Sequence, residues 1–163
     1  MVFNLFKKNK DSGTILKSPL TGKVVPITEV PDPVFSEKMM GEGIAIEPTE
    51  GKVLAPCDGK IIQVAPTKHA VGIETANGEE VLIHVGLDTV NLKGEGFTIH
   101  IVENDEVKQG DELITFDLNY ITENAPSIIT PMVITNSAQL EKEYSYTDES
   151  SAVKGETVLI QVK

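Results

Sequence analysis

Residues 67–88 read TKHAVGIETANGEEVLIHVGLD, and this stretch decides how the chain is expected to fold. It contains two apolar, β-branched runs separated by Asn77-Gly78. An Asn-Gly pair between such runs is the strongest short-range hairpin signal, because both residues tolerate positive φ angles. We therefore expect a β-hairpin with a two-residue turn, in which Val71 lies opposite His84 and His69 lies opposite Gly86.

Side chains alternate between the two faces of a strand, so this register determines which residues share a surface. The face that carries the histidines is predicted to hold Thr67, His69, Val71, Ile73, Leu82, His84, Gly86 and Asp88. Two of the three histidines in the chain then lie as diagonal neighbours, roughly 7–8 Å apart at the backbone. The opposite face, with Val81, Ile83 and Val85, is expected to be core. A four-residue loop would preserve this geometry, whereas a three-residue loop would put the histidines on opposite faces.

Length and composition limit the classes of protein that need to be considered. The 163 residues suit one domain with a buried core, and the net charge of −11 argues against nucleic acid as a partner. No run of about 18 apolar residues occurs, so no membrane-spanning helix is predicted. The single cysteine, Cys57, excludes an intrachain disulfide and fits a reducing compartment, which makes the cytoplasm the expected location.

Residues 1–12 are predicted to be a flexible tail, and residues 13–163 the single folded domain. In the tail, Val2, Leu5 and Phe6 have helical spacing and three lysines follow them. Such a segment could form a short amphipathic helix that touches a membrane. A frayed terminus is the simpler interpretation, because one or two helical turns bury little area. The start at Met1 favours a free-standing protein.

Beyond Gly13, short apolar runs alternate with Gly, Pro or Asp roughly every 8–12 residues. This pattern predicts an all-β fold, either a sandwich or a barrel. Helical patterns are short, and we expect them only around Leu118–Asn124 and Ala138–Lys142.

Three pairs of segments resemble each other within the chain. SPLTGKVV (18–25) matches APCDGKII (55–62), GEGIAI (41–46) resembles GEGFTI (94–99), and VKQGDELI (107–114) resembles VKGETVLI (153–160). The offsets of 37, 53 and 46 residues differ, which excludes a solenoid repeat. They indicate instead a β domain assembled from related half-motifs, in which each Pro-x-x-Gly-Lys turn leads into a strand.

The segment EVPDPVFSEKMMGEG (29–43) departs from the strand pattern. Its four large apolar residues are Val34, Phe35, Met39 and Met40. Packed against the core they would be unremarkable, but displayed on a loop they would form an apolar docking surface.

The paired histidines permit three kinds of chemistry. Imidazole is a good nucleophile at neutral pH, so one ring could accept a phosphoryl group while the other donates a hydrogen bond to it. In that case Thr67 could fix the tautomer of His69. Alternatively, His69, His84 and Asp88 could hold zinc as a hydrolase does. A swinging-arm carrier domain would need a modifiable lysine at a hairpin tip, for which Lys38 is a poor candidate.

The run VLIHVGLDTVNLKGEGF (81–97) closely resembles the active-site motif of the glucose-type enzyme IIA family of the phosphoenolpyruvate-dependent sugar phosphotransferase system. The segments TKHA (67–70), GIAIEP (43–48), APCDGKI (55–61) and ITPMVITN (129–136) also match this family. The resemblance covers residues 13–163 and implies an antiparallel β-sandwich with an internally duplicated motif.

The resemblance also implies a phosphocarrier. His84 matches the histidine that is phosphorylated on Nε2 by phospho-HPr, His69 matches the residue that stabilises the phosphoryl group, and Thr67 matches the residue that orients it. The group would then pass to a cysteine on the IIB domain of a sugar permease. Asn91 stands where relatives often carry glutamate, and His100 matches no functional histidine.

Partner contacts are implied at further positions. The residues that match the docking surface are Asp32, Val34, Phe35, Met39, Met40 and Asp88, of which the two aspartates would meet basic residues of HPr. The transfer needs no metal, although the resemblance allows a zinc ion at His69 and His84 in a regulatory complex. A zinc metallopeptidase-like hydrolase that uses His69, His84 and Asp88 is the alternative.

Overall fold

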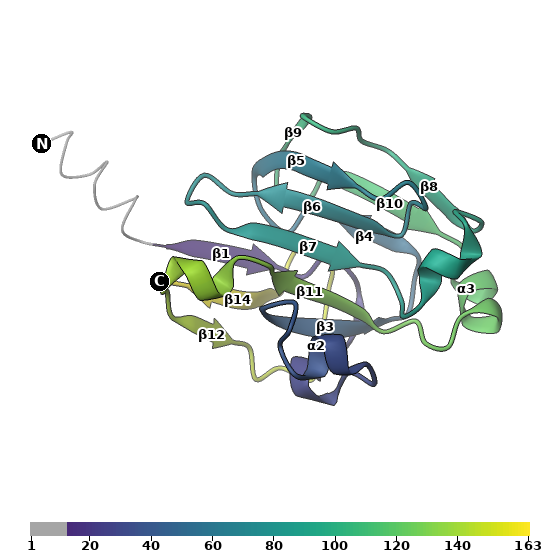
Figure 1. Ribbon diagram of the computed structural model, residues 1–163, viewed down its shortest axis with the longest axis horizontal. Coiled ribbons are helices and arrows are strands. Elements are labelled where there is room, and N and C mark those ends of the chain that lie inside the picture. The colour runs from purple at the N-terminus through teal and green to yellow at the C-terminus, as the bar shows by residue number, and fades with distance from the viewer. Residues whose placement is uncertain (1–12) are drawn as a thin grey trace, which may run out of the picture.

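The computed structural model describes residues 13–163 (Figure 1). The predicted tail of residues 1–12, with its amphipathic pattern, lies outside the described residues. Fourteen short strands form the described part of the chain. They are β1 (Thr14–Lys17), β2 (Gly22–Pro26), β3 (Glu42–Pro48), β4 (Lys52–Leu54), β5 (Gly59–Val64), β6 (Ala70–Glu74), β7 (Glu80–His84), β8 (Phe97–Ile99), β9 (Glu106–Val107), β10 (Glu112–Phe116), β11 (Thr130–Ile134), β12 (Tyr144–Tyr146), β13 (Ser151–Ala152) and β14 (Val158–Val162).

Helical segments are short, as predicted. They are η1 (Ile27–Glu29), α2 (Pro33–Ser36), η2 (Thr89–Leu92), α3 (Leu118–Asn124) and α4 (Ser137–Leu140). The helix predicted over 118–124 is confirmed, with the Asp117 side chain accepting a hydrogen bond from Tyr120 N as its N-cap. Helix α2 was not predicted, although Asp32-Pro33 supplies a favourable N-cap and first helical residue.

The strands form antiparallel sheets, which confirms the all-β prediction. The large sheet has the order β13-β2-β3-β11-β7-β6-β5-β9, and two three-stranded sheets have the orders β1-β14-β12 and β4-β10-β8. Figure 1 shows β11, β7, β6 and β5 side by side across the middle of the molecule.

The strand orders repeat in a way that explains the internal sequence resemblance. One half consists of β4 to β10, which form the β7-β6-β5-β9 part of the large sheet and the small sheet β4-β10-β8. The other half consists of β1–β3 and β11–β14, which form the β11-β3-β2-β13 part and the small sheet β1-β14-β12. Strands in matching places follow the same order along the chain in both halves. The matched strands β2 and β5 begin at Gly22 and Gly59, the glycines of the two Pro-x-x-Gly-Lys turns. A Cβ at Gly22 would lie 2.1 Å from Glu47 O, and a Cβ at Gly59 would lie 2.5 Å from Glu74 O. Both turns therefore need glycine because the neighbouring strand comes so close.

The β6–β7 hairpin exists, but its predicted register is wrong by one residue. Ala70, rather than Val71, lies opposite His84. The loop has three residues, because Thr75 N donates to Glu79 O at 2.9 Å and Gly78 N donates to Thr75 O at 3.1 Å. Gly78 has a φ of 96°, whereas Asn77 is not among the residues with positive φ, so the turn is not the expected type.

This register redistributes the side chains of the hairpin. Val71 and Ile73 were predicted to share a face with His84. They lie instead on the other face, in the larger hydrophobic core. The prediction that Val81, Ile83 and Val85 are core is confirmed, because all three belong to the same cluster. The opposite face of the sheet carries a second apolar cluster, which consists of Val25, Ile27, Val30, Phe35, Ala45, Ala70, Leu82, Leu87 and Val133. His84 lies on this second face, above a packed and rigid support.

Candidate functional site

His84 is the last residue of β7, and its ring is fixed by a backbone carbonyl. Its Nδ1 lies 2.8 Å from Gly86 O. A carbonyl can only accept, so Nδ1 carries the proton and donates this hydrogen bond. In the neutral ring Nε2 then has a free lone pair, which makes it the nucleophilic nitrogen.

His69 lies in the turn before β6, and its ring meets that of His84. The ring centroids are 4.7 Å apart and the ring planes are 78° to each other. Thr67 Oγ1 lies 2.7 Å from His69 Nδ1. The three residues predicted to form the site therefore come together, although the register that was expected to bring them together is wrong.

Burial keeps both rings neutral at pH 7. Burial, and then the neighbouring His84, lower the pKa of His69 to about 4, against the opposing effect of a hydrogen bond with the Thr67 backbone. Burial also lowers the pKa of His84, which is opposed by the hydrogen bond to Gly86 and by the negative charges of Asp32 and Asp88. Two neutral imidazoles in contact can offer one lone pair to an electrophile and one N–H to its oxygens.

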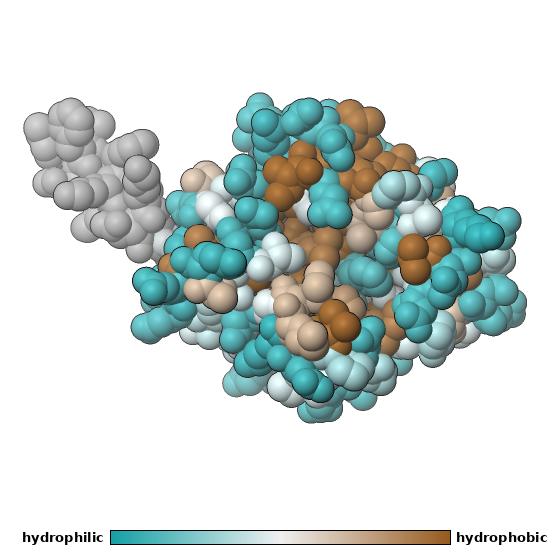
Figure 2. Space-filling model, viewed as in Figure 1, coloured by the Kyte–Doolittle hydropathy of each residue, from teal (hydrophilic) through white to brown (hydrophobic). Residues whose placement is uncertain are grey.

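The four apolar residues of the 29–43 segment separate into two groups. Val34 and Met39 are 41% and 70% exposed, and on the face shown in Figure 2 apolar groups lie over the α2 segment with polar groups around them. Phe35 is not displayed as the docking-surface prediction requires, because it is 5% exposed and its ring centroid lies 5.4 Å from that of His84. Met40 is half-buried against the same cluster. Phe35 and Met40 thus support the site from below.

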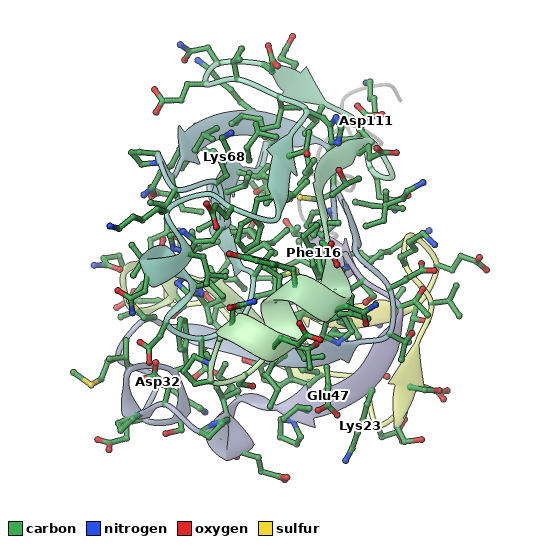
Figure 3. The ribbon with its side chains drawn as sticks, turned by 90° about the vertical axis from the view of Figure 1, so that its right-hand side faces the viewer. Lys23, Asp32, Glu47, Lys68, Asp111 and Phe116 are labelled. Carbon is green, nitrogen blue, oxygen red and sulfur yellow. The ribbon has the colours of Figure 1, made fainter. Side chains whose placement is uncertain are left out.

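Asp32 and Asp88 supply negative charges that act on His84. Asp32, on the α2 loop in Figure 3, is half-buried, and its Oδ1 accepts a hydrogen bond from Val34 N at 3.0 Å. Asp88 is exposed and has a left-handed backbone, with a φ of 57°. Their charges reach His84, since both oppose the lowering of its pKa.

Comparison with known proteins assigns this arrangement to a family. Residues 14–140 match the model of the phosphoenolpyruvate-dependent sugar phosphotransferase system, EIIA 1 family. The chain belongs to this family.

Relatives cover nearly the whole of the chain. A glucose-specific EIIA component from Staphylococcus epidermidis is 52% identical, over 99% of this chain and 98% of its own length. One from Halalkalibacterium halodurans is 50% identical, over 99% and 96%. The solved structure of glucose permease IIA from Mycoplasma capricolum has a TM-score of 0.82 and 38% identity, over 91% of this chain and 94% of that one. The EIIA chain is thus a phosphotransferase-system component with a phosphocarrier role in sugar uptake.

The alternative interpretations find no support in this EIIA fold. Residues 13–163 contain no group of three or more His, Cys, Asp or Glu side chains that could hold a metal, so the predicted set of His69, His84 and Asp88 is not assembled. Lys38 follows α2 rather than a hairpin tip and pairs with Glu42 at 3.4 Å, which does not suit a swinging arm. Within the same residues, no helix is long and apolar enough to cross a membrane.

Two contributors to the site were not predicted from the sequence. The Gly86 carbonyl determines the tautomer of His84, and the glycine two residues after the histidine was the available signal. Lys68, between Thr67 and His69, has a φ of 64°, for which the sequence offers no signal. The third histidine, His100, lies elsewhere, with its Nε2 2.9 Å from Thr115 Oγ1.

Proposed function

We propose that His84 accepts a phosphoryl group from phospho-HPr and passes it to a cysteine on the IIB domain of a sugar permease. The observation that supports this most strongly is the 2.8 Å contact between His84 Nδ1 and Gly86 O, which leaves Nε2 unprotonated. The lone pair of Nε2 would attack the phosphorus of the donor phosphohistidine. The donor's N–P bond would break as the new one forms, and its electron pair would return to the donor imidazole.

His69 would stabilise the phosphoryl group rather than carry it. When the Thr67 hydroxyl donates a hydrogen bond to His69 Nδ1, the proton of the neutral His69 ring is on Nε2. This Nε2–H can then donate a hydrogen bond to a phosphoryl oxygen. In the second step a cysteine thiolate would attack the same phosphorus, and His84 would leave as a neutral imidazole. Phosphoryl transfer depends mainly on positioning and charge stabilisation, which a rigid sheet can supply.

We also propose that the face around His84 receives both partners in turn. Val34 and Met39 supply exposed apolar area, and Asp32 and Asp88 supply negative charge for a basic partner. The relay would operate in the cytoplasm, and the names of the relatives make glucose the first sugar to test. Two imidazoles give only two zinc ligands, so a regulatory zinc at His69 and His84 would require further ligands from a partner.

The proposal is tested by incubating the chain with phosphoenolpyruvate, enzyme I and HPr and measuring its intact mass. We expect the mass of one phosphoryl group to be added and to be lost in acid. His84→Gln should remove the addition, while the control His100→Gln should retain it. Undiminished labelling of His84→Gln would show that the assignment is wrong.

A further inference from the structure

The side chain of His69 does not point in the direction that the alternation of β6 predicts. Ala70 pairs with His84, and Val85 N donates to His69 O at 2.7 Å, so the carbonyl of His69 follows the ladder between β6 and β7. Regular alternation would then point the His69 side chain away from the His84 face, towards the main core. Its ring instead lies 4.7 Å from that of His84. The alternation is therefore interrupted where the chain enters β6.

The break occurs at Lys68. This residue has a φ of 64°, the left-handed region that L-residues other than Asn and Asp seldom adopt. It ends a turn in which Lys68 N donates to Ala65 O at 2.8 Å, and Ala65 N donates to Ala70 O at 3.0 Å. A left-handed residue next to a strand acts as a β-bulge does, because it re-aims the neighbouring side chain.

The ammonium group of Lys68 plays no visible part in this geometry. The side chain is exposed, and no salt bridge joins it to a carboxylate among residues 13–163. Its stem passes Gly94, where a Cβ would lie 3.6 Å from Lys68 Cδ. Figure 3 shows Lys68 on the side of the molecule that also carries Asp32.

We propose that Lys68 is a positioning residue whose left-handed backbone, rather than its charge, sets His69 against His84 for phosphoryl transfer. The relay role rests on the proposed function, whereas the placement of the ring does not. Strain at such a residue persists only where the surrounding structure holds it, and such residues gather at functional sites.

Variants of Lys68 that all remove its charge distinguish a role of its backbone conformation from a role of its charge. Lys68→Gly and Lys68→Asn tolerate positive φ, whereas Lys68→Val opposes it through its β-branch. We expect onward transfer to IIB to fall about tenfold or more in Lys68→Val, and to stay within about twofold of the unmodified chain in the other two. Lys68→Ala should fall between them and replaces the valine variant if that does not fold.

Nuclear Overhauser effects between the ring protons of His69 and His84 report the placement independently of activity. They should persist in Lys68→Gly and Lys68→Asn and should weaken or vanish in Lys68→Val. An equal loss of transfer in the glycine and valine variants would assign the effect to the lysine side chain and overturn the proposal. Retention of both ring contacts and transfer in Lys68→Val would also overturn it. If the unmodified chain takes no phosphate on His84, the proposed function fails, but the ring contacts still decide the role of Lys68.

Discussion

His84 and His69 touch each other, yet their Nδ1 atoms have partners of different kinds. The Gly86 carbonyl can only accept a hydrogen bond, which leaves His84 with a lone pair on Nε2. The Thr67 hydroxyl can also donate, which allows His69 to keep a proton on Nε2. This difference supports unequal roles for two rings that sequence register alone treats as equivalent.

The role of His69 predicts a split between the two half-reactions. His69→Gln should still allow His84 to take phosphate from phospho-HPr, because the nucleophile is intact. Transfer onward to IIB should slow, since the N–H that stabilises the phosphoryl group is replaced by an amide with different reach. Rapid-quench kinetics of each half-reaction would measure this, and unchanged rates in both would remove His69 from the mechanism.

The buried ring of His69 also predicts a pH dependence of stability. Its pKa in the folded chain is about 4, below its ordinary value of 6.5, and it is 7% exposed. The unfolded chain therefore binds more protons between these values, so the free energy of unfolding should fall as pH drops from about 6.5 to about 4. The loss should approach about 3 kcal/mol and level off below that range.

Urea unfolding of the unmodified chain and of His69→Gln across this pH range would measure the effect. Carboxylates titrate in both proteins, so the difference between the two curves isolates His69. A constant difference from pH 7 to pH 4 would contradict the assigned burial of the neutral ring.

At the level of elements, the tip of the β6–β7 hairpin is held by a buried carboxylate. Glu79 has no exposed surface and accepts hydrogen bonds from Thr14 Oγ1 at 2.7 Å, from Thr75 Oγ1 and from Lys142 Nζ at 2.7 Å. The Asn77 side chain donates to Thr14 Oγ1 at 2.9 Å. The hairpin tip is thereby joined to β1 and to the segment that follows α4.

Removing the cation of this pair should destabilise the fold. Lys142→Met leaves Glu79 buried without its counter-charge, and we expect a loss of about 3 kcal/mol in the free energy of unfolding. The matched control is Lys52→Met, because Lys52 pairs with Glu112 at 3.5 Å with side chains 47% and 43% exposed, and this should cost less than about 1 kcal/mol. Equal stabilities for the two variants in chemical denaturation would refute the structural role of the pair.

The same network explains what the sequence could and could not predict about the hairpin. Asn77-Gly78 correctly indicated a turn between two strands. The size of the loop depends on Asn77 and Glu79 binding groups at Thr14 and Lys142, which are more than 60 residues away in the chain. Local turn preferences contain no information about such distant partners. The histidines nevertheless meet, which we attribute to the left-handed backbone at Lys68.

Over the whole molecule, the duplicated strand order was the part most accessible to sequence analysis. The matched Pro-x-x-Gly-Lys turns keep glycine because a neighbouring strand contacts the same point in each half. The proposed docking surface was harder to predict, because a cluster of large apolar residues does not reveal which of them point outward. Phe35 lies beneath His84, whereas Met39, four residues later, is exposed.

The exposed surface predicts a binding effect without a loss of stability. Met39→Ser should raise the KM for phospho-HPr several-fold, because 70% of the Met39 side chain is available for contact, while its unfolding free energy should change by less than about 0.5 kcal/mol. Val102→Ser is the control, since Val102 is 65% exposed. Val102 follows β8, which belongs to the β4-β10-β8 sheet and not to the large sheet that carries His84. Steady-state transfer assays would compare them, and equal KM values would remove Met39 from the docking surface.

The central claim is that Nε2 of His84 carries the phosphoryl group. It is tested most directly by nitrogen-15 NMR of the phosphorylated chain with labelled histidine, which identifies the residue and the ring nitrogen bonded to phosphorus. We predict one phosphorylated nitrogen, Nε2 of His84, with His69 and His100 unmodified. Phosphate on Nδ1 of His84, or on either of the other histidines, would contradict the account.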